Sequence, residues 1–492
     1  MLLSTSKRLL HVICAFFMIA LMGGAVYGWP SMRPMLRREG ALRSNACETL
    51  ALGRTCDDQE LSLGLVFTVG AWSNQGGRLF VGIVLDRIGP RLTSCSCAFV
   101  CFIGSLIFAF ASNTFQFAAG YFCIGVGGAG MQLSLQSVAT LFPQNKGLVM
   151  AMLSGAFQAA SSVFLFFEVL HRSTDLSLRA LMLSYAGVLL FVGIACLVIW
   201  PSAPFGTHSP KAAKGQEQLE ATSPETSLQH GEGTKEIVDL PLNKRSFREQ
   251  LFSSEYVLMT TFFTCIVIQA QFTIGTIGTQ LELKGDEGDL TRTFNLIFSL
   301  SWTITPIVGY AIDRFGYVAI FVVMNSVLLG CYLCLLSPWL GLQIVTAVLY
   351  MLGRVSIWAA FFSFNGFIFG FQNFGKLAGG GLFIASCCSL VQYPLLELTL
   401  EAFDGEFAYV NALFVGICVA MYPLILRLSC ALEKSKTSRI GDVVATEPEI
   451  NKCGTKAIEK GVEVVDAIVD PEGGQDAKTP KSSIEVSTVM SI

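Results

Sequence analysis

The stretch GIVLDRIGPRL, Gly82–Leu92, is the strongest indication of the fold, because a weaker copy, GYAIDRFGY at Gly309–Tyr317, follows about half a chain later. Both copies place an Asp-Arg pair and a glycine after an apolar run. The rest of the chain avoids charge: 52% of its 492 residues are hydrophobic, 14% are charged, and the mean hydropathy is +0.58. Soluble domains carry about 25% charged residues. This composition predicts an integral membrane protein that faces lipid and binds no nucleic acid.

Uncharged stretches supply enough helices for twelve crossings, since each crossing needs about 20 mostly apolar residues. The stretches are Leu9–Met32, Leu61–Leu85 (interrupted by Arg78), Leu92–Asn145 (two crossings), Gly147–Phe167, Ala180–Trp200, Tyr256–Leu281, Thr293–Ile312, Phe315–Gly353 with the residues after it (two crossings), Leu377–Leu396 and Phe407–Leu426. We therefore expect an all-α membrane protein.

The twelve helices divide into two groups of six. We expect an N-terminal bundle over residues 1–201 and a C-terminal bundle over 254–429. The segments 202–253 and 430–492 are polar and charged, which predicts a disordered linker and a disordered tail. An even number of crossings places both termini on one side, and the excess of Lys and Arg on that side predicts that it is cytoplasmic.

The repeated turn joins the second helix to the third in each half, which predicts two parallel six-helix repeats, an architecture of secondary transporters. Glycines permit close helix approach and sharp reversal, and an Asp-Arg network can hold one side shut in one state only. The alternative is that Asp-Arg only marks a helix end at the membrane surface. The expected gate residues are Gly82, Asp86, Arg87, Gly89 and Arg91 in the first copy and Asp313, Arg314 and Gly316 in the second.

The pattern Gly-x-x-x-Asp-Arg-x-Gly-x-Arg resembles the loop motif of the major facilitator superfamily, although the second copy has Tyr317 and no later Arg. Further stretches, GWPSMRPMLRREG (Gly28–Gly40), LVFTVGAW (Leu65–Trp72), IQAQFTIGTIGTQLE (Ile268–Glu282), NFGKLAGG (Asn373–Gly380) and LVQYP (Leu390–Pro394), are similar to solute carrier family 43 and to the related apicomplexan amino acid transporters. The resemblance implies the major facilitator fold and facilitative, sodium-independent transport of large neutral amino acids, although members of the family differ in which amino acids they carry. The plasma membrane is the default location for a nutrient carrier.

Two arginines lie inside predicted helices, Arg78 in the second and Arg354 in the tenth. A cation in hydrocarbon costs about 2.5–3.5 kcal/mol on insertion scales and usually faces a cavity or a partner. Because the guanidinium fork matches a carboxylate, we expect one of them to bind the α-carboxylate of an amino acid. The alternative is a structural Arg bonded to helix carbonyls or to Asp86. The family 43 resemblance implies an Arg at the position of Arg354 and gives no such support to Arg78.

Polar residues mark further candidate substrate contacts. Gln269 and Thr273 are four residues apart on one face of the seventh helix, and such a face lines a cavity or bonds across helices. Gln132 lies on the Gly-rich fourth helix, and Tyr27 in the first is a candidate aromatic wall, although core packing is the commoner role of an aromatic side chain.

The predicted helices contain no carboxylate in mid-membrane. Proton-coupled carriers generally need an ionisable relay there, so the sequence favours a uniporter or exchanger over a proton-coupled carrier. The 16 cysteines show no metal-ligand spacing, and we find no nucleophile–base pair, so we expect neither cofactor, metal nor enzyme activity.

Cys47 and Cys56 share one polar loop and can form a disulfide if that loop is extracytoplasmic. Alternatives are a carrier of another carboxylate or solute, and a transporter-like sensor.

Overall fold

The computed structural model describes residues 5–44, 47, 56–142, 146–174, 176–201, 242–370 and 373–433. Regular structure within these residues is helical. Most of the predicted linker (202–241) and of the predicted tail (434–492) lie outside the described residues.

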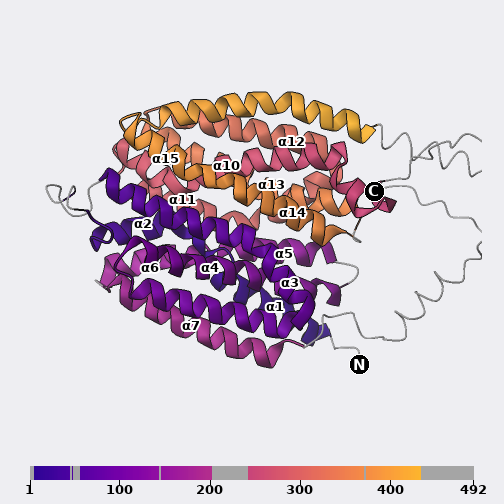
Figure 1. Cartoon of the computed structure of the whole chain (residues 1–492), viewed down its shortest axis with the longest axis horizontal. Helices are drawn as coiled ribbons and strands as arrows, with labels where there is room; N and C mark the ends of the chain where they lie inside the picture. Colours follow the sequence, from indigo (N-terminus) through magenta and orange to yellow (C-terminus); the bar gives the residue numbers. More distant parts are fainter. Residues whose placement is uncertain are drawn as a thin grey trace, which may run out of the picture. The chain divides into compact units, whose positions relative to one another are not determined.

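The helices form two groups that follow the chain, here called the N-terminal and C-terminal halves (Figure 1). The N-terminal half contains α1 (Thr5–Met22), a short 3-10 turn (Ala25–Gly28), α2 (Trp29–Arg38), α3 (Asp57–Ala109), α4 (Thr114–Leu135), α5 (Lys146–Ala159), α6 (Ser162–Thr174) and α7 (Leu178–Ile199). The C-terminal half contains α10 (Ser254–Leu283), α11 (Asp289–Ser299), α12 (Thr305–Leu336), α13 (Gln343–Ile368), α14 (Phe374–Cys388), α15 (Gln392–Glu401) and a final helix (Ala408–Glu433). Helix α1 begins and the final helix ends on the same side of Figure 1.

The all-α membrane architecture is confirmed, while the number of crossings stays a prediction. Across the described parts of the chain, eight helices are long and apolar enough to cross a membrane, or up to ten if each of two bent pairs is one crossing. Two of the twelve predicted crossings are not among these ten. Both are helical in the structure and correspond to the first part of α3 and to α4. The first contains polar residues and the second many glycines, and both kinds of residue lower the hydropathy of a helix.

The repeated motif has the same backbone in both halves. Gly89 kinks α3 with φ 76° and ψ 173°, and Gly316 kinks α12 with φ 79° and ψ 168°. This region of φ and ψ is open almost only to glycine, so both motif glycines make the sharp reversal that we expected. The close helix approach expected at Gly82 is wrong: a Cβ there meets its nearest neighbour, Leu133 Cδ2, at an ordinary 3.7 Å.

The end of the predicted disordered linker is an ordered element. Residues 247–251 form the short helix α9, which begins with a capping box between Ser246 and Glu249. The hydrogen bonds from Ser246 lower the pKa of the Glu249 carboxyl. Gln250 donates to the carbonyl of Phe369 (3.2 Å) and accepts from Asn373 (3.0 Å), so α9 is attached to the segment between α13 and α14.

Large apolar side chains cover the outside of the helices as well as the core. Phe115, Phe191 and Val198 are 80%, 71% and 79% exposed. Single exposed apolar residues are common in soluble proteins, whereas large contiguous apolar surfaces mark contact with another apolar phase. The outer faces of these helices therefore suit lipid, and the polar residues of interest lie between the two halves.

Candidate substrate site and closed end between the two halves

Two buried arginines from different halves converge on one indole ring. Arg78 comes from α3 and Arg354 from α13, one turn before Trp358 on the same helix. The Cζ atoms of Arg78 and Arg354 lie 5.8 and 5.4 Å from the centre of a Trp358 ring. Each guanidinium has a second aromatic neighbour, Phe157 at 5.0 Å for Arg78 and Tyr27 at 4.8 Å for Arg354. Cation–π contacts of this kind hold the two charged groups between aromatic surfaces.

Arg354 lacks the hydrogen bonds that a buried cation needs. It is 1% exposed, and its Nε, Nη1 and Nη2 atoms all lie buried without a partner. Arg78 is 7% exposed and donates from Nε to the carbonyl of Asn74 at 3.4 Å. Among the side chains that the structure describes, no carboxylate pairs with either arginine. A buried charge without a partner is costly, and the described side chains leave the charge of Arg354 without a compensating carboxylate.

The hydroxyl of Tyr27 connects the two halves beside Arg354. It accepts a hydrogen bond from Gln75 Nε2 on α3 (3.1 Å) and another from Gln271 Nε2 on α10 (3.3 Å). Both amide groups thereby direct a donor to Tyr27, and the Oε1 atoms of Gln75 and Gln271 remain buried without partners. The site therefore combines unused guanidinium donors with unused amide acceptors, a set that complements a small molecule bearing both an anionic group and N–H donors.

Other predicted substrate contacts lie elsewhere. Gln269 accepts from the thiol of Cys418 (3.5 Å), and Thr273 bonds to the Tyr332 hydroxyl (3.4 Å). Both contacts stay within the C-terminal half, so this face of α10 bonds across to α12 and the final helix. Gln269 Nε2 is left buried without a hydrogen-bond partner, and a cavity-lining role for this face stays a prediction. Gln132 is buried in α4 with Oε1 unpartnered, and the described contacts do not bring it to the arginines.

Sequence reasoning missed Gln271 and Gln75. Gln271 is two residues from Gln269, which turns it to another face of α10. Gln75 is next to Asn74, whose amide donates to the carbonyls of Gly23 and Gly125 at 3.0 Å and so packs α3 against its neighbours. A polar residue in an apolar helix was the available signal for both. Their meeting at Tyr27 depends on the packing of the two halves.

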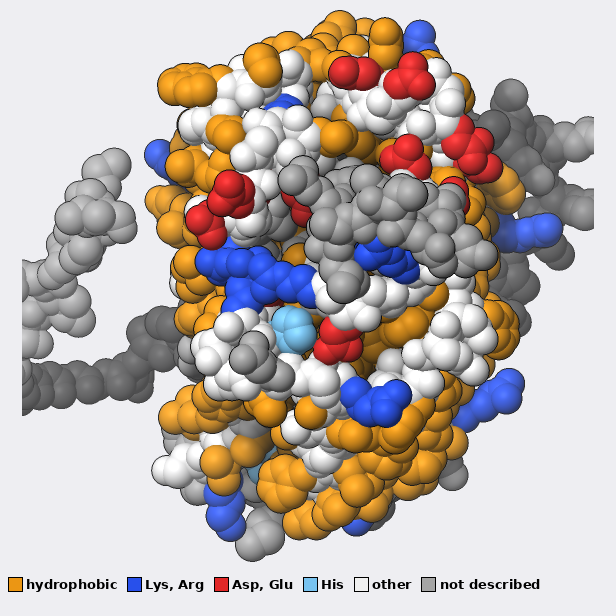
Figure 2. All heavy atoms as spheres, turned by 90° about the vertical axis from the view of Figure 1, so that its left-hand side faces the viewer, with side chains coloured by type: hydrophobic (Ala, Val, Ile, Leu, Met, Phe, Trp, Pro, Cys, Tyr) orange, Lys and Arg blue, Asp and Glu red, His pale blue; other side chains and the backbone are white. Residues whose placement is uncertain are grey.

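An ion cluster joins the two halves at one end, here called the disulfide end. Arg33 on α2 donates to Glu60 on α3 (2.8 Å) and to Glu282 on α10 (3.2 Å). Arg37 lies 3.6 Å from Glu60 and also pairs with Glu282. Thr279 on α10 adds a hydrogen bond to Glu60 of 3.0 Å. Figure 2 shows acidic and basic side chains on this face of the molecule. The side chains of Arg33, Arg37 and Glu60 are buried, only 2–4% exposed, and the cluster joins the two halves at this end.

Two further contacts cross between the halves at the same end. Glu168 on α6 pairs with Arg172 at 2.8 Å and lies 3.8 Å from Arg292 on α11. Asn295 on α11 donates to the hydroxyl of Ser31 on α2 at 2.8 Å. The closure therefore involves α2, α3 and α6 from one half and α10 and α11 from the other.

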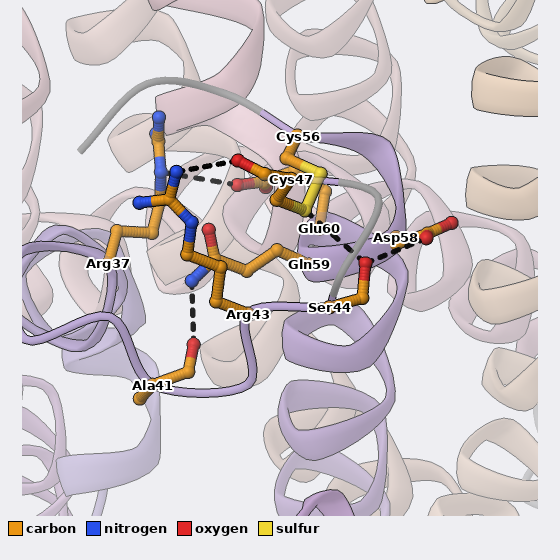
Figure 3. The surroundings of a disulfide bond; sticks show 9 residues. All are labelled: Arg37, Ala41, Arg43, Ser44, Cys47, Cys56, Asp58, Gln59 and Glu60. Carbon is orange, nitrogen blue, oxygen red and sulfur yellow. Dashed lines mark hydrogen bonds and ion pairs between the residues drawn. A yellow bond between two sulfur atoms is a disulfide. The ribbon is translucent and has the colours of Figure 1, made fainter. Parts of the chain in front are cut away.

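The structure joins Cys47 and Cys56 in a disulfide, with 5.9 Å between their Cα atoms (Figure 3). Cys56 is the residue before α3, and its carbonyl accepts from the backbone N–H of Glu60 (2.9 Å). Gln59 donates to the carbonyl of Ala41 (2.6 Å), which ties the start of α3 to the chain after α2. The disulfide thus lies one turn from the carboxylate that pairs with the arginines.

The predicted gate at the repeated motif stays a prediction. The side chains of Asp86 and Asp313 lie outside the described residues. Arg87 and Arg314 are exposed and Arg91 is partly buried. The ion pairs between the halves that the structure describes lie at the disulfide end, and the sequence signals for them were Arg33 and Arg37, four residues apart on one helix face.

The fold and the buried polar site define a membrane transporter built from two helical halves. The family model of the Major Facilitator Superfamily matches residues 49–390, and the chain belongs to that family. It is therefore a multi-pass membrane transporter and not an enzyme. A solved structure with a similar fold is that of a mutant of the nucleoside transporter NupG, with a TM-score of 0.56 over 86% of this chain and 99% of that one at 11% identity.

Three relatives cover most of the chain at low identity. The chain is similar to arginine transporter 1 of Toxoplasma gondii (23% identical, 88% of this chain, 91% of the relative) and to equilibrative nucleobase transporter 1 of Bos taurus (22%, 84% and 94%). It is also similar to the human large neutral amino acids transporter small subunit 3 (22%, 78% and 86%). The resemblance read from the short stretches is confirmed by these relatives.

Proposed function

We propose that this chain carries amino acids across the plasma membrane by alternating access, as a uniporter or exchanger. The observation that carries the proposal is Arg354, whose three guanidinium nitrogens are buried without partners at the contact between the halves. A carboxylate accepts two parallel hydrogen bonds from such a fork. The substrate carboxylate supplies the missing negative charge at Arg354.

The polar groups beside Arg354 support an amino acid over a simple carboxylate. The Oε1 atoms of Gln75 and Gln271 are acceptors without partners, held by the bonds that their amide nitrogens donate to Tyr27. An α-ammonium group offers three donors. In this proposal Arg354 binds the α-carboxylate and the two amide oxygens accept from the α-ammonium, so that α3, α10 and α13 all contact one substrate.

The disulfide supports one orientation of the chain in the membrane. Disulfides persist in oxidising compartments outside the cytosol, so we place the Cys47–Cys56 end outside and both termini in the cytoplasm. The structure then corresponds to a state closed to the outside by the Arg33 and Arg37 ion cluster. Substrate binding between halves that alternate in this way is the mechanism of secondary transporters.

Uptake of labelled amino acids into oocytes expressing the full chain tests the proposal. The panel contains neutral, acidic and cationic amino acids, with lactate and adenine as competing substrate classes. We expect saturable amino acid uptake that Arg354→Gln abolishes. The matched control is Arg179→Gln, because Arg179 also lies over an aromatic ring, Phe110 at 5.3 Å, on α7 away from the site.

The uptake results distinguish an amino acid carrier from a carrier of another solute. Uptake of adenine or lactate without amino acid uptake, in protein shown at the cell surface, contradicts the proposal and favours a nucleobase carrier or a monocarboxylate carrier, respectively. Equal uptake by Arg354→Gln and the control makes Arg354 structural. Loss of uptake on collapse of the proton gradient, at fixed membrane potential, contradicts the uncoupled mechanism.

A further inference from the structure

Arg78 is a second buried cation at the proposed site, and binding of an α-carboxylate by Arg354 leaves its charge unneutralised. The Cζ atoms of Arg78 and Arg354 lie 5.8 and 5.4 Å from the centre of a ring of the same indole, that of Trp358. Each guanidinium also contacts its own aromatic ring, Phe157 or Tyr27. The pair is therefore two positive charges around one aromatic side chain.

We propose that the substrate carries a second carboxylate, so that this transporter selects acidic amino acids. The inference rests on the proposed function: Arg354 binds one carboxylate of the substrate and Arg78 binds the other. An acidic amino acid has its two carboxylates a few bonds apart, a separation that suits two guanidinium groups that contact one indole. Each carboxylate accepts a charge-assisted pair of hydrogen bonds from its arginine.

The charge balance of the site supports this class of substrate over the others. Two like charges in a medium of low dielectric repel each other strongly, and the described side chains contribute no carboxylate to either. A neutral amino acid is a zwitterion with no net charge, so the occupied site keeps the net positive charge of its two arginines. A cationic amino acid adds a third positive charge. An acidic amino acid is the class of amino acid that lowers the net charge of the occupied site.

The three groups of an acidic amino acid each have a partner in the site. The carboxylates have Arg78 and Arg354, and the ammonium group has the unpartnered Oε1 atoms of Gln75 and Gln271. The methylene groups between the carboxylates have the indole of Trp358, which is 8% exposed. This assignment leaves Trp358 as the central contact and gives both arginines a ligand.

Competition between glutamate and glutamine tests the proposal, because the two differ by one charge at nearly constant shape. In oocytes expressing the full chain, we expect glutamate to be taken up with about ten- to a hundred-fold higher affinity than glutamine, the value of one charged hydrogen-bonding pair. Arg78→Gln is expected to lose that preference while it still takes up glutamine. Arg78→Lys, which keeps the charge, is expected to restore part of it, and Arg179→Gln is the control that leaves the preference unchanged.

Failure of this inference is distinguishable from failure of the proposed function. Saturable uptake of neutral amino acids with glutamate excluded, and the same selectivity in Arg78→Gln, overturns the acidic substrate and leaves amino acid transport standing. Uptake of succinate but of no amino acid, dependent on Arg78, overturns amino acid transport and keeps the site for two carboxylates. An equal loss of glutamate and glutamine uptake in Arg78→Gln at normal surface expression makes Arg78 structural and also overturns the inference.

Discussion

Removal of the charge of Glu282 is expected to open the disulfide end of the transporter. Glu282 is the residue of α10 that accepts from both Arg33 and Arg37 of α2. In Glu282→Gln, both arginines keep their contacts with Glu60, at 2.8 and 3.6 Å, and lose the carboxylate of the other half. The cluster exists only while the two halves meet at this end, so its loss destabilises the closed state and leaves the open state unaffected.

The size of the effect follows from burial. Breaking a fully buried ion pair costs about 3–5 kcal/mol, but the Glu282 side chain is 23% exposed and water replaces part of the lost interaction. We therefore expect about 2 kcal/mol, which shifts the equilibrium between closed and open states about thirty-fold toward the open state.

Accessibility of a buried cysteine measures this shift. Ser31 is fully buried at the contact between the halves and accepts from Asn295. The Ser31→Cys variant places a thiol at this contact. We expect an impermeant thiol reagent added from outside to react with that thiol at least ten times faster when Glu282→Gln is also present, an acceleration that the estimated shift of about thirty-fold toward the open state allows. The background is the reaction of the chain with Ser31 intact. Asp289→Asn is the matched control, because Asp289 is an 84% exposed partner of Arg292 and exposed pairs contribute little.

An unchanged reaction rate in folded Glu282→Gln protein refutes the reasoning, since it means that the ion cluster does not hold this end shut. An equal acceleration in Asp289→Asn also refutes it, because any loss of charge at this end then has the same effect.

Three further predictions concern stability and the site. Gly89→Ala places a Cβ at φ 76° and is expected to cost about 1–3 kcal/mol in the free energy of unfolding, measured by thermal unfolding in detergent. Cys47→Ser with Cys56→Ser removes a loop closure worth about 2.5 kcal/mol and is expected to lower the midpoint in the same assay. Tyr27→Phe removes the acceptor of two buried amides and is expected to weaken the free energy of substrate binding by about 1–3 kcal/mol, measured from the concentration dependence of uptake.

Each of these has a control or a contradicting result. Gly82→Ala meets only an ordinary contact of 3.7 Å and should unfold like the wild type; equal destabilisation at Gly82 and Gly89 contradicts the backbone argument. An unchanged midpoint on reduction of the wild-type chain contradicts the disulfide prediction. Unaltered uptake by Tyr27→Phe at normal expression means that the two amides do not contact substrate.

The class of protein and the repeat were predictable from sequence because both are local properties. Hydropathy needs no knowledge of neighbouring helices, and the two Asp-Arg-x-Gly turns place glycine at Gly89 and Gly316, where the structure has positive φ. An arginine inside an apolar helix is likewise a local signal, and it indicated Arg354. Periodicity along α10 selected the face of Gln269, whose described hydrogen bond stays within its own half, and did not select Gln271, which reaches Tyr27 of the other half.

The amino-acid sequence is enough to identify a membrane transporter with two halves and two arginines inside its helices, since the cost of a charge in hydrocarbon applies wherever the helix packs. Which side chains meet depends on the packing of the helices in three dimensions. Arg33 and Glu282 are 249 residues apart, and Tyr27 and Gln271 are 244 apart. Contacts of that separation depend on how the two halves pack, and no pattern within one helix specifies the partner. The convergence of Arg78 and Arg354 on Trp358 is of the same kind.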